Sequence, residues 1–415
     1  MYWANVLHFY QPPTQSEDIV RRVANESYRK IVTILEETPT ARMTLNVTAC
    51  LTDQLYRYGF RDVIEGIGRL AERGQVELTG TAMFHPILPM LSTDEVRRQI
   101  QLNEINNRRY FGEVFDPKGF FPPELCYSFE VADIAATFGY RWIIMDEIGL
   151  NGRLGQARKD VIYGLQGLKG FNVFFSDRSF SAGLTHGLFP TSKEFERAIG
   201  RQAASDAYLL TATKGEIYGH HRPGQEELLR QVFAAGFPKT ATVSELMGLF
   251  AATATASPLP SSWSTWEDEM ADLAPYPQWN YPGNHIHELQ WQLTYLALDL
   301  LELLPPESDN YAEARTVMDE ALHSCQYCWA SCRPWWNPAM IDRGVELLSR
   351  VIALVERQLP SEKVVRAREL ADGIIRESQL WQSSGKARRL QRQYLAGHLQ
   401  ASGDLTSGTG GIQRL

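Results

Sequence analysis

The stretch from Gly119 to Ser128 carries the clearest chemical potential in the chain. It reads Gly-Phe-Phe-Pro-Pro-Glu-Leu-Cys-Tyr-Ser, so a single carboxylate, Glu124, follows two prolines. Proline has no N–H to donate to a neighbouring strand, and the pair therefore predicts the end of a strand, with a helix starting near Ser128. A carboxylate at such a corner is ionised at neutral pH and can act as a nucleophile. The structural alternative is that Glu124 caps the helix or lies in a solvated loop.

The elements that would position this carboxylate alternate between short apolar runs and longer helical stretches, from residue 4 to about residue 243. Strands separated by helices of this length predict parallel pairing with right-handed crossovers, and hence an α/β fold. The predicted strands are Ala4–His8, Met43–Thr48, Val76–Gly80, Gly119–Phe121, Trp142–Met145, Val173–Phe175 and Tyr208–Thr213, and the predicted helices include Asp18–Leu35, Thr52–Ala71, Asp94–Tyr110 and Phe129–Phe138.

Polar side chains follow the carboxyl end of nearly every predicted strand. In a closed barrel all of them would converge on one mouth, whereas in an open doubly wound sheet only those beside the switch point would meet. Contributions from seven strands favour the barrel. The residues are His8 and Gln11, Cys50, Thr81 and His85, Glu124, Asp146, Asp177 with Arg178, and Lys214 with Glu216.

The alternation stops in the segment 252–284, which is rich in proline, serine and aromatic residues. Structureless connections longer than about 12–15 residues are usually functional or disordered, and the aromatic content argues against disorder. We therefore predict four parts: a barrel over residues 1–251, an aromatic-rich loop over its mouth at 252–284, a C-terminal helical bundle at 285–400, and a flexible tail at 401–415. The helical periodicity covers His285–Leu304, Asn310–Ser331, Pro338–Gln358 and roughly Ser361–His398.

Bulk properties narrow the classes of partner. The net charge of −8 argues against nucleic acid and anionic membrane surfaces. Ten tryptophans and seventeen tyrosines suit stacking on sugar rings. The residues from Met1 to His8 read as a strand rather than a leader, and no apolar run approaches the ~20 residues of a membrane span. With five cysteines, these features predict a reduced, cytoplasmic protein.

Several motifs, in order along residues 3–340, resemble glycoside hydrolase family 57, the retaining α-glucan enzymes of α-amylase, 4-α-glucanotransferase and branching-enzyme type. The resemblance implies an incomplete (β/α)7 barrel followed by an α-helical domain, Glu124 as the nucleophile, and an α-glucan or maltooligosaccharide as substrate. The motifs are His8 to Pro12 (His-Phe-Tyr-Gln-Pro), Gly74 to Gly80 with Phe84 to Pro89, Phe121 to Glu124, Gly215 to His221, Phe175 to Arg178, and Trp335-Trp336. The sugar-binding residues it implies are His8, Gln11, His85, Asp177, Arg178, His220, His221, Trp335 and Trp336, to which the aromatic segment adds Trp263.

One position departs from the family pattern. Active members carry Asp-Gly-Glu in the fourth motif, with the aspartate as general acid, and this chain carries Lys214-Gly-Glu216. Retaining glycosidases need two carboxyl groups about 5–5.5 Å apart, and a lysine pKa near ~10.4 is far from the ~6–7 that suits this acid. We predict an ion pair between Lys214 and Glu124 that quenches the nucleophile. Glu216 is the candidate replacement acid, because residues two apart on a strand share a face, and Asp146 and Asp177 are weaker alternatives.

Three functions follow. The first is an α-glucan hydrolase or transglycosylase of retaining type, with weak or absent activity because of Lys214. The second is a catalytically silent α-glucan-binding or regulatory homologue. The third is a metal-dependent barrel enzyme such as a deacetylase, whose ligands would come from His8, His85, His220 and His221. Since these histidines form no compact ligand motif, we expect no metal and no cofactor.

Overall fold

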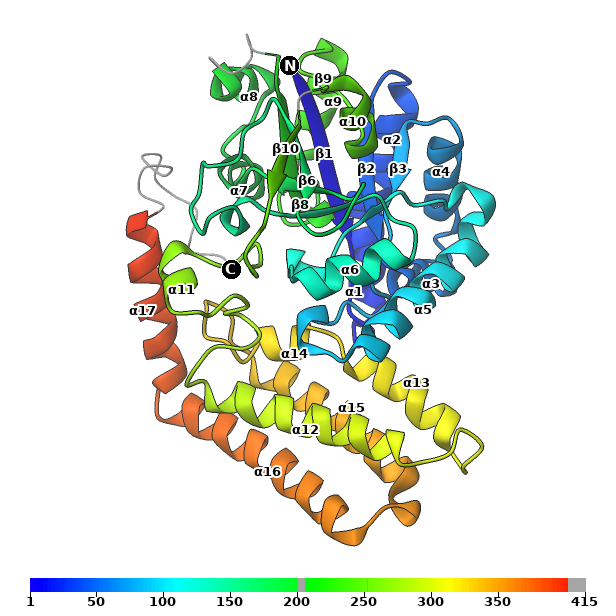
Figure 1. Cartoon of the computed structure of the whole chain (residues 1–415), viewed down its shortest axis with the longest axis vertical. Helices are drawn as coiled ribbons and strands as arrows, with labels where there is room; N and C mark the ends of the chain where they lie inside the picture. Colours follow the sequence, from blue (N-terminus) through cyan, green and yellow to red (C-terminus); the bar gives the residue numbers. More distant parts are fainter. Residues whose placement is uncertain (201–205, 252, 402–415) are drawn as a thin grey trace. The chain divides into compact units, whose positions relative to one another are not determined.

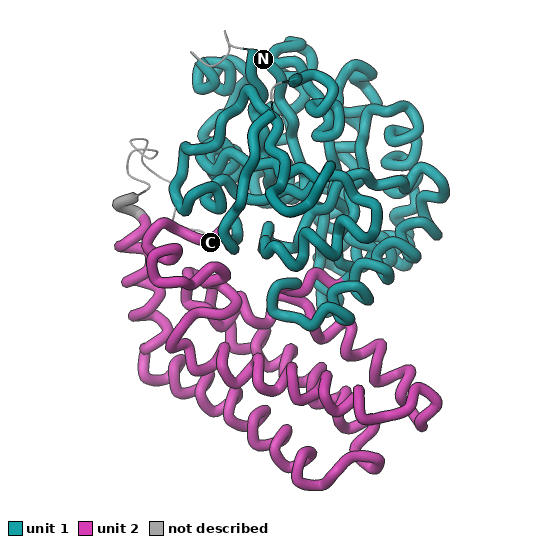
Figure 2. The backbone as a smooth tube through the Cα atoms, viewed as in Figure 1, with its two compact units in different colours: residues 1–83, 88–263, 411–415 teal, residues 84–87, 264–410 magenta. Residues whose placement is uncertain are grey.

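The structure, a computed structural model, describes residues 1–200, 206–251 and 253–401. The described chain divides into two compact units (Figure 2). Among the described residues, unit 1 contains Met1–Met83 and Leu88–Trp263, and unit 2 contains Phe84–Ile87 and residues 264–401. The aromatic-rich segment 252–284 is therefore shared, because its residues up to Trp263 belong to unit 1 and the remainder to unit 2.

Unit 1 is built on two five-stranded sheets, in the orders β3-β2-β1-β8, with β9 also pairing β1, and β10-β6-β7-β5-β4 (Figure 1). Every strand pair is parallel except β6 with β7. The α/β class is confirmed, but the pairing of the described strands gives no closed barrel. The strands are β1 Tyr2–Phe9, β2 Met43–Val47, β3 Val76–Leu78, β4 Gly119–Phe120, β5 Trp142–Asp146, β6 Ile162–Leu165, β7 Asn172–Ser176, β8 Tyr208–Lys214, β9 Lys239–Thr240 and β10 Thr253–Ala256.

All seven predicted strands are present, and β6, β9 and β10 were not predicted. β9 has only two residues, and β10 reads Thr-Ala-Thr-Ala, which offers no apolar run for sequence reasoning to find. The two sheets meet at two places. Gly80 forms an isolated parallel bridge with Phe120, and the amide of Asp177 donates to the carbonyl of Leu210 at 2.8 Å.

The side chains of β1 alternate between two buried layers, as the period of a strand requires. Leu7 and Phe9 pack in the cluster that contains the helices α2 and α4, whereas Ala4 and Val6 pack against residues of the second sheet. A parallel strand with both faces buried is the usual consequence of helices covering the sheet. His8 shares the face of Ala4 and Val6, so its side chain is directed toward the second sheet.

The helices of unit 1 follow the predicted pattern with two corrections. The stretch predicted as Asp18–Leu35 contains a π-helical turn, η1, and the stretch predicted as Thr52–Ala71 is two helices, because Gly59 has φ 84° between them. The elements are α1 Glu17–Val23, η1 Ala24–Tyr28, α2 Arg29–Glu37, α3 Ala49–Arg57, α4 Arg61–Glu72, α5 Thr93–Phe111, α6 Phe129–Thr137, α7 Arg178–His186, α8 Ser192–Ile199, α9 Glu226–Ala235 and α10 Val243–Leu249.

Unit 2 is helical, which confirms the predicted helical C-terminal region (Figure 1). The predicted helix Asn310–Ser331 is wrong as one element, because it is divided into α13 and the single turn α14. Most of the predicted tail, 402–415, lies outside the described residues, and no described helix is both long and apolar enough to span a membrane. The helices are α11 Glu267–Ala271, α12 His285–Glu302, α13 Tyr311–Ala321, α14 Cys325–Cys328, α15 Pro338–Val355, α16 Ser361–Ser383 and α17 Lys386–Ala401.

Candidate functional site

Glu124 lies where the sequence predicts it, at the corner between β4 and α6. The strand ends at Phe120, and Glu124 occupies a short 3-10 turn with φ 57° and ψ 19°, a left-handed conformation that is uncommon for a residue with a side chain. The cap of α6 is Ser128, whose hydroxyl accepts from the amide of Val131. Glu124 is only 7% exposed. The alternative in which it caps the helix or lies in a solvated loop is therefore wrong.

The segment Ser261–Trp263 runs along this corner and is fixed to it by the backbone. The amide of Tyr127 donates to the carbonyl of Ser261 at 2.8 Å, and the amide of Trp263 donates to the carbonyl of Glu124 at 3.3 Å. A guanidinium nitrogen of Arg178 donates to the carbonyl of Ser262 at 3.3 Å. The Trp263 indole is thereby held beside the Glu124 carboxyl group.

Lys214, the last residue of β8, is brought to the same place by the first sheet. It is the register partner of His8 on β1, and the His8 ring stacks on Phe121 with centroids 4.9 Å apart. The Lys214 ammonium lies 5.8 Å from the centre of the Trp263 ring. Strand pairing and ring packing thus bring Lys214, Trp263 and Glu124 together.

Burial sets the ionisation of these groups. It raises the pKa of Glu124, against the opposing effects of the Lys214 charge and a hydrogen bond from the Trp263 side chain. Burial also lowers the pKa of His8 to about 3, although a hydrogen bond to Asn46 opposes the shift. The pKa of His221 is lowered to about 4, first by burial and then by the charges of His220 and Lys214. Both histidines are therefore neutral at pH 7.

Glu216 lies past the strand end, in the 3-10 turn Gly215–Ile217, so the prediction that it shares a strand face with Lys214 is wrong. Its Oε1 accepts hydrogen bonds from the Tyr28 hydroxyl and, at 3.0 Å, from the Gln11 amide. Burial raises the pKa of Glu216, while the Tyr28 hydrogen bond opposes the shift. Two hydrogen bonds thus hold Oε1 of Glu216 as an acceptor, while burial favours the protonated form of the carboxyl group.

The π-helical turn η1 supplies partners that sequence reasoning missed. Besides Tyr28, the hydroxyl of Ser27 donates to the carbonyl of Gly215 at 2.9 Å, and Glu26 pairs with His220 at 2.6 Å. Gly215 has no room for a side chain, since a Cβ there would lie 2.3 Å from the Phe9 ring. No sequence pattern marks a π-helical turn, which is why Tyr28 could not be singled out.

The two aspartates considered as alternative acids are engaged by cations. Asp146 forms a buried ion pair with Arg178 at 2.7 Å, and Asp177 pairs with Lys159 and caps α7. Glu147, which was also not predicted, accepts from the amide of Arg178 at 2.9 Å and has a pKa raised chiefly by burial. These residues form a second polar layer that holds Arg178 and, through it, Ser262.

Three of the predicted sugar-binding residues belong to unit 2. His85 Nδ1 lies 2.9 Å from the Ser324 hydroxyl, Trp335 packs edge-on against Trp329, and Trp336 stacks on Trp381. The described residues contain no group of three or more His, Cys, Asp or Glu side chains that could hold a metal ion.

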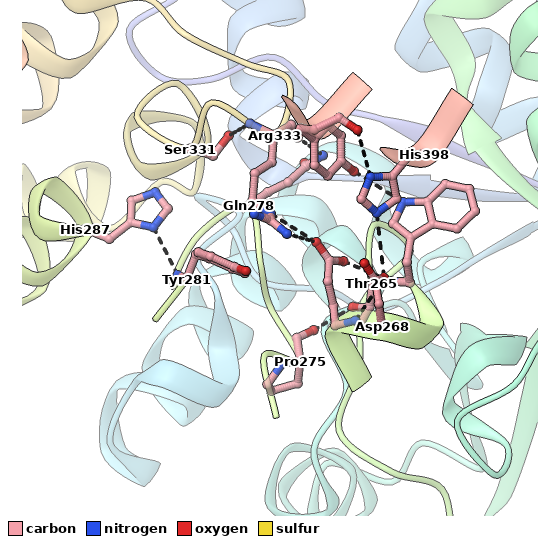
Figure 3. Close-up of polar contacts among 12 residues, drawn as sticks. Thr265, Asp268, Pro275, Gln278, Tyr281, His287, Ser331, Arg333 and His398 are labelled. Atoms are coloured by element: carbon pink, nitrogen blue, oxygen red, sulfur yellow. Dashed lines mark hydrogen bonds and ion pairs between the residues drawn. The ribbon is translucent and has the colours of Figure 1, made fainter. Parts of the chain in front are cut away.

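Unit 2 also carries a buried charge pair (Figure 3). Glu269 is 1% exposed and accepts from Arg333 at 2.6 Å, while the Arg333 guanidinium lies 3.6 Å from the centre of the Tyr281 ring. The Trp266 indole donates to the Tyr394 hydroxyl at 3.2 Å. These contacts connect α11, the loop after α14, and α17.

Comparison with known proteins gives concordant results. A sequence model of Glycosyl hydrolase family 57 matches residues 4–256. An α-amylase of Pyrococcus horikoshii is 26% identical over 141 residues, covering 34% of this chain and 22% of the relative. A 4-α-glucanotransferase of Thermococcus litoralis is 23% identical over 141 residues, covering 34% and 21%. The chain thus aligns with about a fifth of these relatives' length.

Solved structures resemble this chain in fold over more of its length than the sequence matches do. A branching enzyme of Thermococcus kodakaraensis superimposes with a TM-score of 0.69 at 15% identity, covering 89% of this chain and 94% of that one. The α-amylase AmyC of Thermotoga maritima gives 0.67 at 13% identity, covering 91% and 97%. At these identities the superpositions show the fold alone.

Proposed function

Because the chain belongs to glycosyl hydrolase family 57, we propose that it is an α-glucan-active protein of retaining type with Glu124 as the nucleophile. The curated relatives are an α-amylase and a 4-α-glucanotransferase. The chain spans only about a fifth of their length, so the α-glucan substrate is carried over here as part of the proposal. The burial of Glu124 beside Trp263 supports it, since an indole next to a nucleophile suits a sugar ring.

We further propose that β1, β2, β3, β4, β5, β7 and β8 form the family's incomplete seven-stranded barrel. The bridge between Gly80, which follows β3, and Phe120 of β4 joins one end of the first sheet to the second sheet. The hydrogen bond from Asp177, which follows β7, to Leu210 of β8 joins the other end of the first sheet to the second. A ring of this order would bring the carboxyl ends of all seven strands to one mouth, where Glu124 and Lys214 follow their strands.

The observation that carries the functional proposal is the position of the Lys214 ammonium, over the same indole that bonds Glu124. In a retaining glycosidase that place belongs to the acid that protonates the leaving oxygen. A lysine with a reference pKa of ~10.4 cannot supply this proton efficiently near pH 7. Turnover of α-glucan is therefore weak or absent in this chain.

The substitution Lys214→Asp tests the proposal. Incubation with maltooligosaccharides should show new chain lengths, with turnover raised by about 10²–10⁴-fold, the usual contribution of a general acid. Lys214→Asn is the matched control, because it removes the charge without supplying a carboxyl group. If the Asp variant does not exceed the Asn variant, Lys214 is not what limits catalysis.

A second candidate is a silent α-glucan-binding protein, favoured by the hydrogen bonds that keep Glu216 an acceptor. In that case affinity for maltooligosaccharides, measured by calorimetry, should survive Glu124→Ala and be lost in Trp263→Ala, while Lys214→Asp gains no turnover.

A further inference from the structure

Several of the groups around Glu124 are held by other residues or are uncharged, which limits the supply of a proton to a leaving group. Glu216 accepts two hydrogen bonds on Oε1, and Asp146 and Asp177 are paired with Arg178 and Lys159. His8 and His221 are neutral, with pKa values of about 3 and about 4. A leaving group that is stable without protonation therefore suits this site.

The residue that stands in the place of the acid is instead a cation. Lys214 extends from the end of β8, is exposed, and lies over Trp263, whose backbone and side chain both bond Glu124. When Glu124 attacks a sugar, its carboxylate becomes a neutral ester and the negative charge moves to the leaving group. A fixed ammonium beside the site favours that transfer of charge, provided that the leaving group is an anion.

We propose that this chain transfers glucosyl units from donors with a phosphate on the anomeric carbon, with Glu124 as nucleophile and the Lys214 ammonium stabilising the departing phosphate. The donor is a sugar 1-phosphate or a nucleoside diphosphate sugar, which share this chemistry. The inference rests on the proposed function, because it uses the same nucleophile and the same sugar.

The two steps balance without a protein acid. The Glu124 oxygen attacks C1, the C1–O bond to phosphate breaks, and its electron pair leaves on the phosphate. A sugar 1-phosphate reacts as the monoanion and leaves as HPO₄²⁻, and a nucleoside diphosphate leaves as its anion. In the second step a hydroxyl of water or of a glucan end attacks C1, the ester bond breaks and its pair returns to Glu124. The hydroxyl proton passes to the released phosphate.

Of the nearby carboxylates, only Glu124 changes its charge during the reaction. Glu216 lies in the turn after Lys214 and is held by hydrogen bonds from Tyr28 and Gln11, so its attraction for Lys214 is the same before and after the attack. Glu124 itself loses its charge as the bond to C1 forms. The attraction of Lys214 therefore passes from Glu124 to the phosphate as the reaction proceeds.

The test compares donors in the purified full chain. Glucose 1-phosphate and a nucleoside diphosphate glucose are each supplied with maltotriose, and α-glucosyl fluoride serves as a donor that leaves without protonation. Release of phosphate, nucleoside diphosphate or fluoride is followed together with growth of the maltotriose. We expect at least one phosphate donor to be used. In Lys214→Gln turnover of the phosphate donor should fall by about 100-fold, whereas Lys214→Arg should retain it.

Each result decides something. Use of fluoride but neither phosphate donor overturns the phosphate inference and leaves Glu124 as the nucleophile. Phosphate-donor turnover unaffected by Lys214→Gln, or phosphate release that persists in Glu124→Ala, overturns it as well. If no donor is used, the fluoride included, then both the inference and the proposed function fail. For the sugar 1-phosphate, turnover should decline as pH rises past about 6, where its monoanion is lost.

Discussion

At the scale of single residues, Glu124 is both the proposed nucleophile and a source of instability. Its backbone is left-handed, and burial raises the pKa of its carboxyl group above that of the unfolded chain. The folded protein therefore binds this proton more tightly than the unfolded chain does. The stabilisation of the folded state that this proton provides is complete at pH values below the pKa of the carboxyl group in the unfolded chain. It is lost as the pH rises through the higher pKa of the folded protein.

Glu124→Gln should consequently raise the free energy of unfolding at pH 7, because glutamine carries no charge for burial to disfavour. The gain should disappear below about pH 4, where the wild-type carboxyl group is protonated in both states. Urea unfolding at the two pH values measures the difference. Glu65→Gln, an exposed position on α4, is the control, and a gain of equal size there would contradict the role of burial.

The sequence predicted where Glu124 lies along the fold, but it did not predict the contacts around it. Pro122 and Pro123 predict where a strand must end, and this placed Glu124 correctly. The hydrogen bonds to Glu216 come from Gln11 and Tyr28, which are distant in sequence. Tertiary packing alone brings these elements together, and no local pattern encodes it.

At the scale of elements, the π-helical turn η1 is the feature that holds the Lys214–His221 segment. Its residues Glu26, Ser27 and Tyr28 each contact that segment. A π-helical turn inserts a residue into a helix and is often found at functional sites. The helix was predicted from its periodicity, but the turn was not, because one extra residue barely disturbs an apolar pattern.

Tyr28→Phe should remove one donor from a buried carboxylate and keep the packing on Phe9. We expect a loss of about 1–3 kcal/mol in the free energy of unfolding, the range for leaving a buried polar group short of a partner. The midpoint of urea unfolding should fall while its slope stays unchanged. Tyr56→Phe, whose hydroxyl accepts from Arg61 at the surface, should change stability by less than about 0.5 kcal/mol. Equal losses of stability in Tyr28→Phe and Tyr56→Phe would show that burial of the hydrogen bond between Tyr28 and Glu216 does not increase its contribution.

At the scale of the whole molecule, each of the two units has a buried ion pair of its own. Unit 1 has Asp146 with Arg178, and unit 2 has Glu269 with Arg333. Strand and helix periodicity predicted the α/β and helical regions, because both patterns are local. Neither pair could be predicted as a pair, since the partners are far apart in sequence and charged residues are usually exposed.

Arg333→Gln should leave the Glu269 carboxylate buried without its cation, and this should lower the free energy of unfolding by about 3–5 kcal/mol. Burial already raises the pKa of Glu269, and the Arg333 charge opposes the shift, so the substitution should raise this pKa further. The deficit should therefore shrink as pH falls from 7 toward 5, because protonation removes the unpaired charge. Thermal unfolding at the two pH values measures it.

Arg368→Gln serves as the matched control for this substitution. Its pair with Glu356 lies at the surface, with the arginine side chain 67% exposed, and such pairs contribute about 0–1 kcal/mol. The description of Glu269 as a buried partner would be contradicted if Arg333→Gln lost no more stability than Arg368→Gln. It would also be contradicted if the loss of stability in Arg333→Gln grew as the pH was lowered.

The backbone ladder between Ser261–Trp263 and Glu124–Tyr127 has a practical consequence for anyone who shortens this gene. The family match ends at residue 256, so an expression clone trimmed to that match would omit Trp263. Its product would keep Glu124 but lose the hydrogen bonds that the Trp263 amide and indole make to it. If such a fragment showed no activity, the cause would be the missing Trp263 segment, and the result would say nothing about the activity of the longer chain.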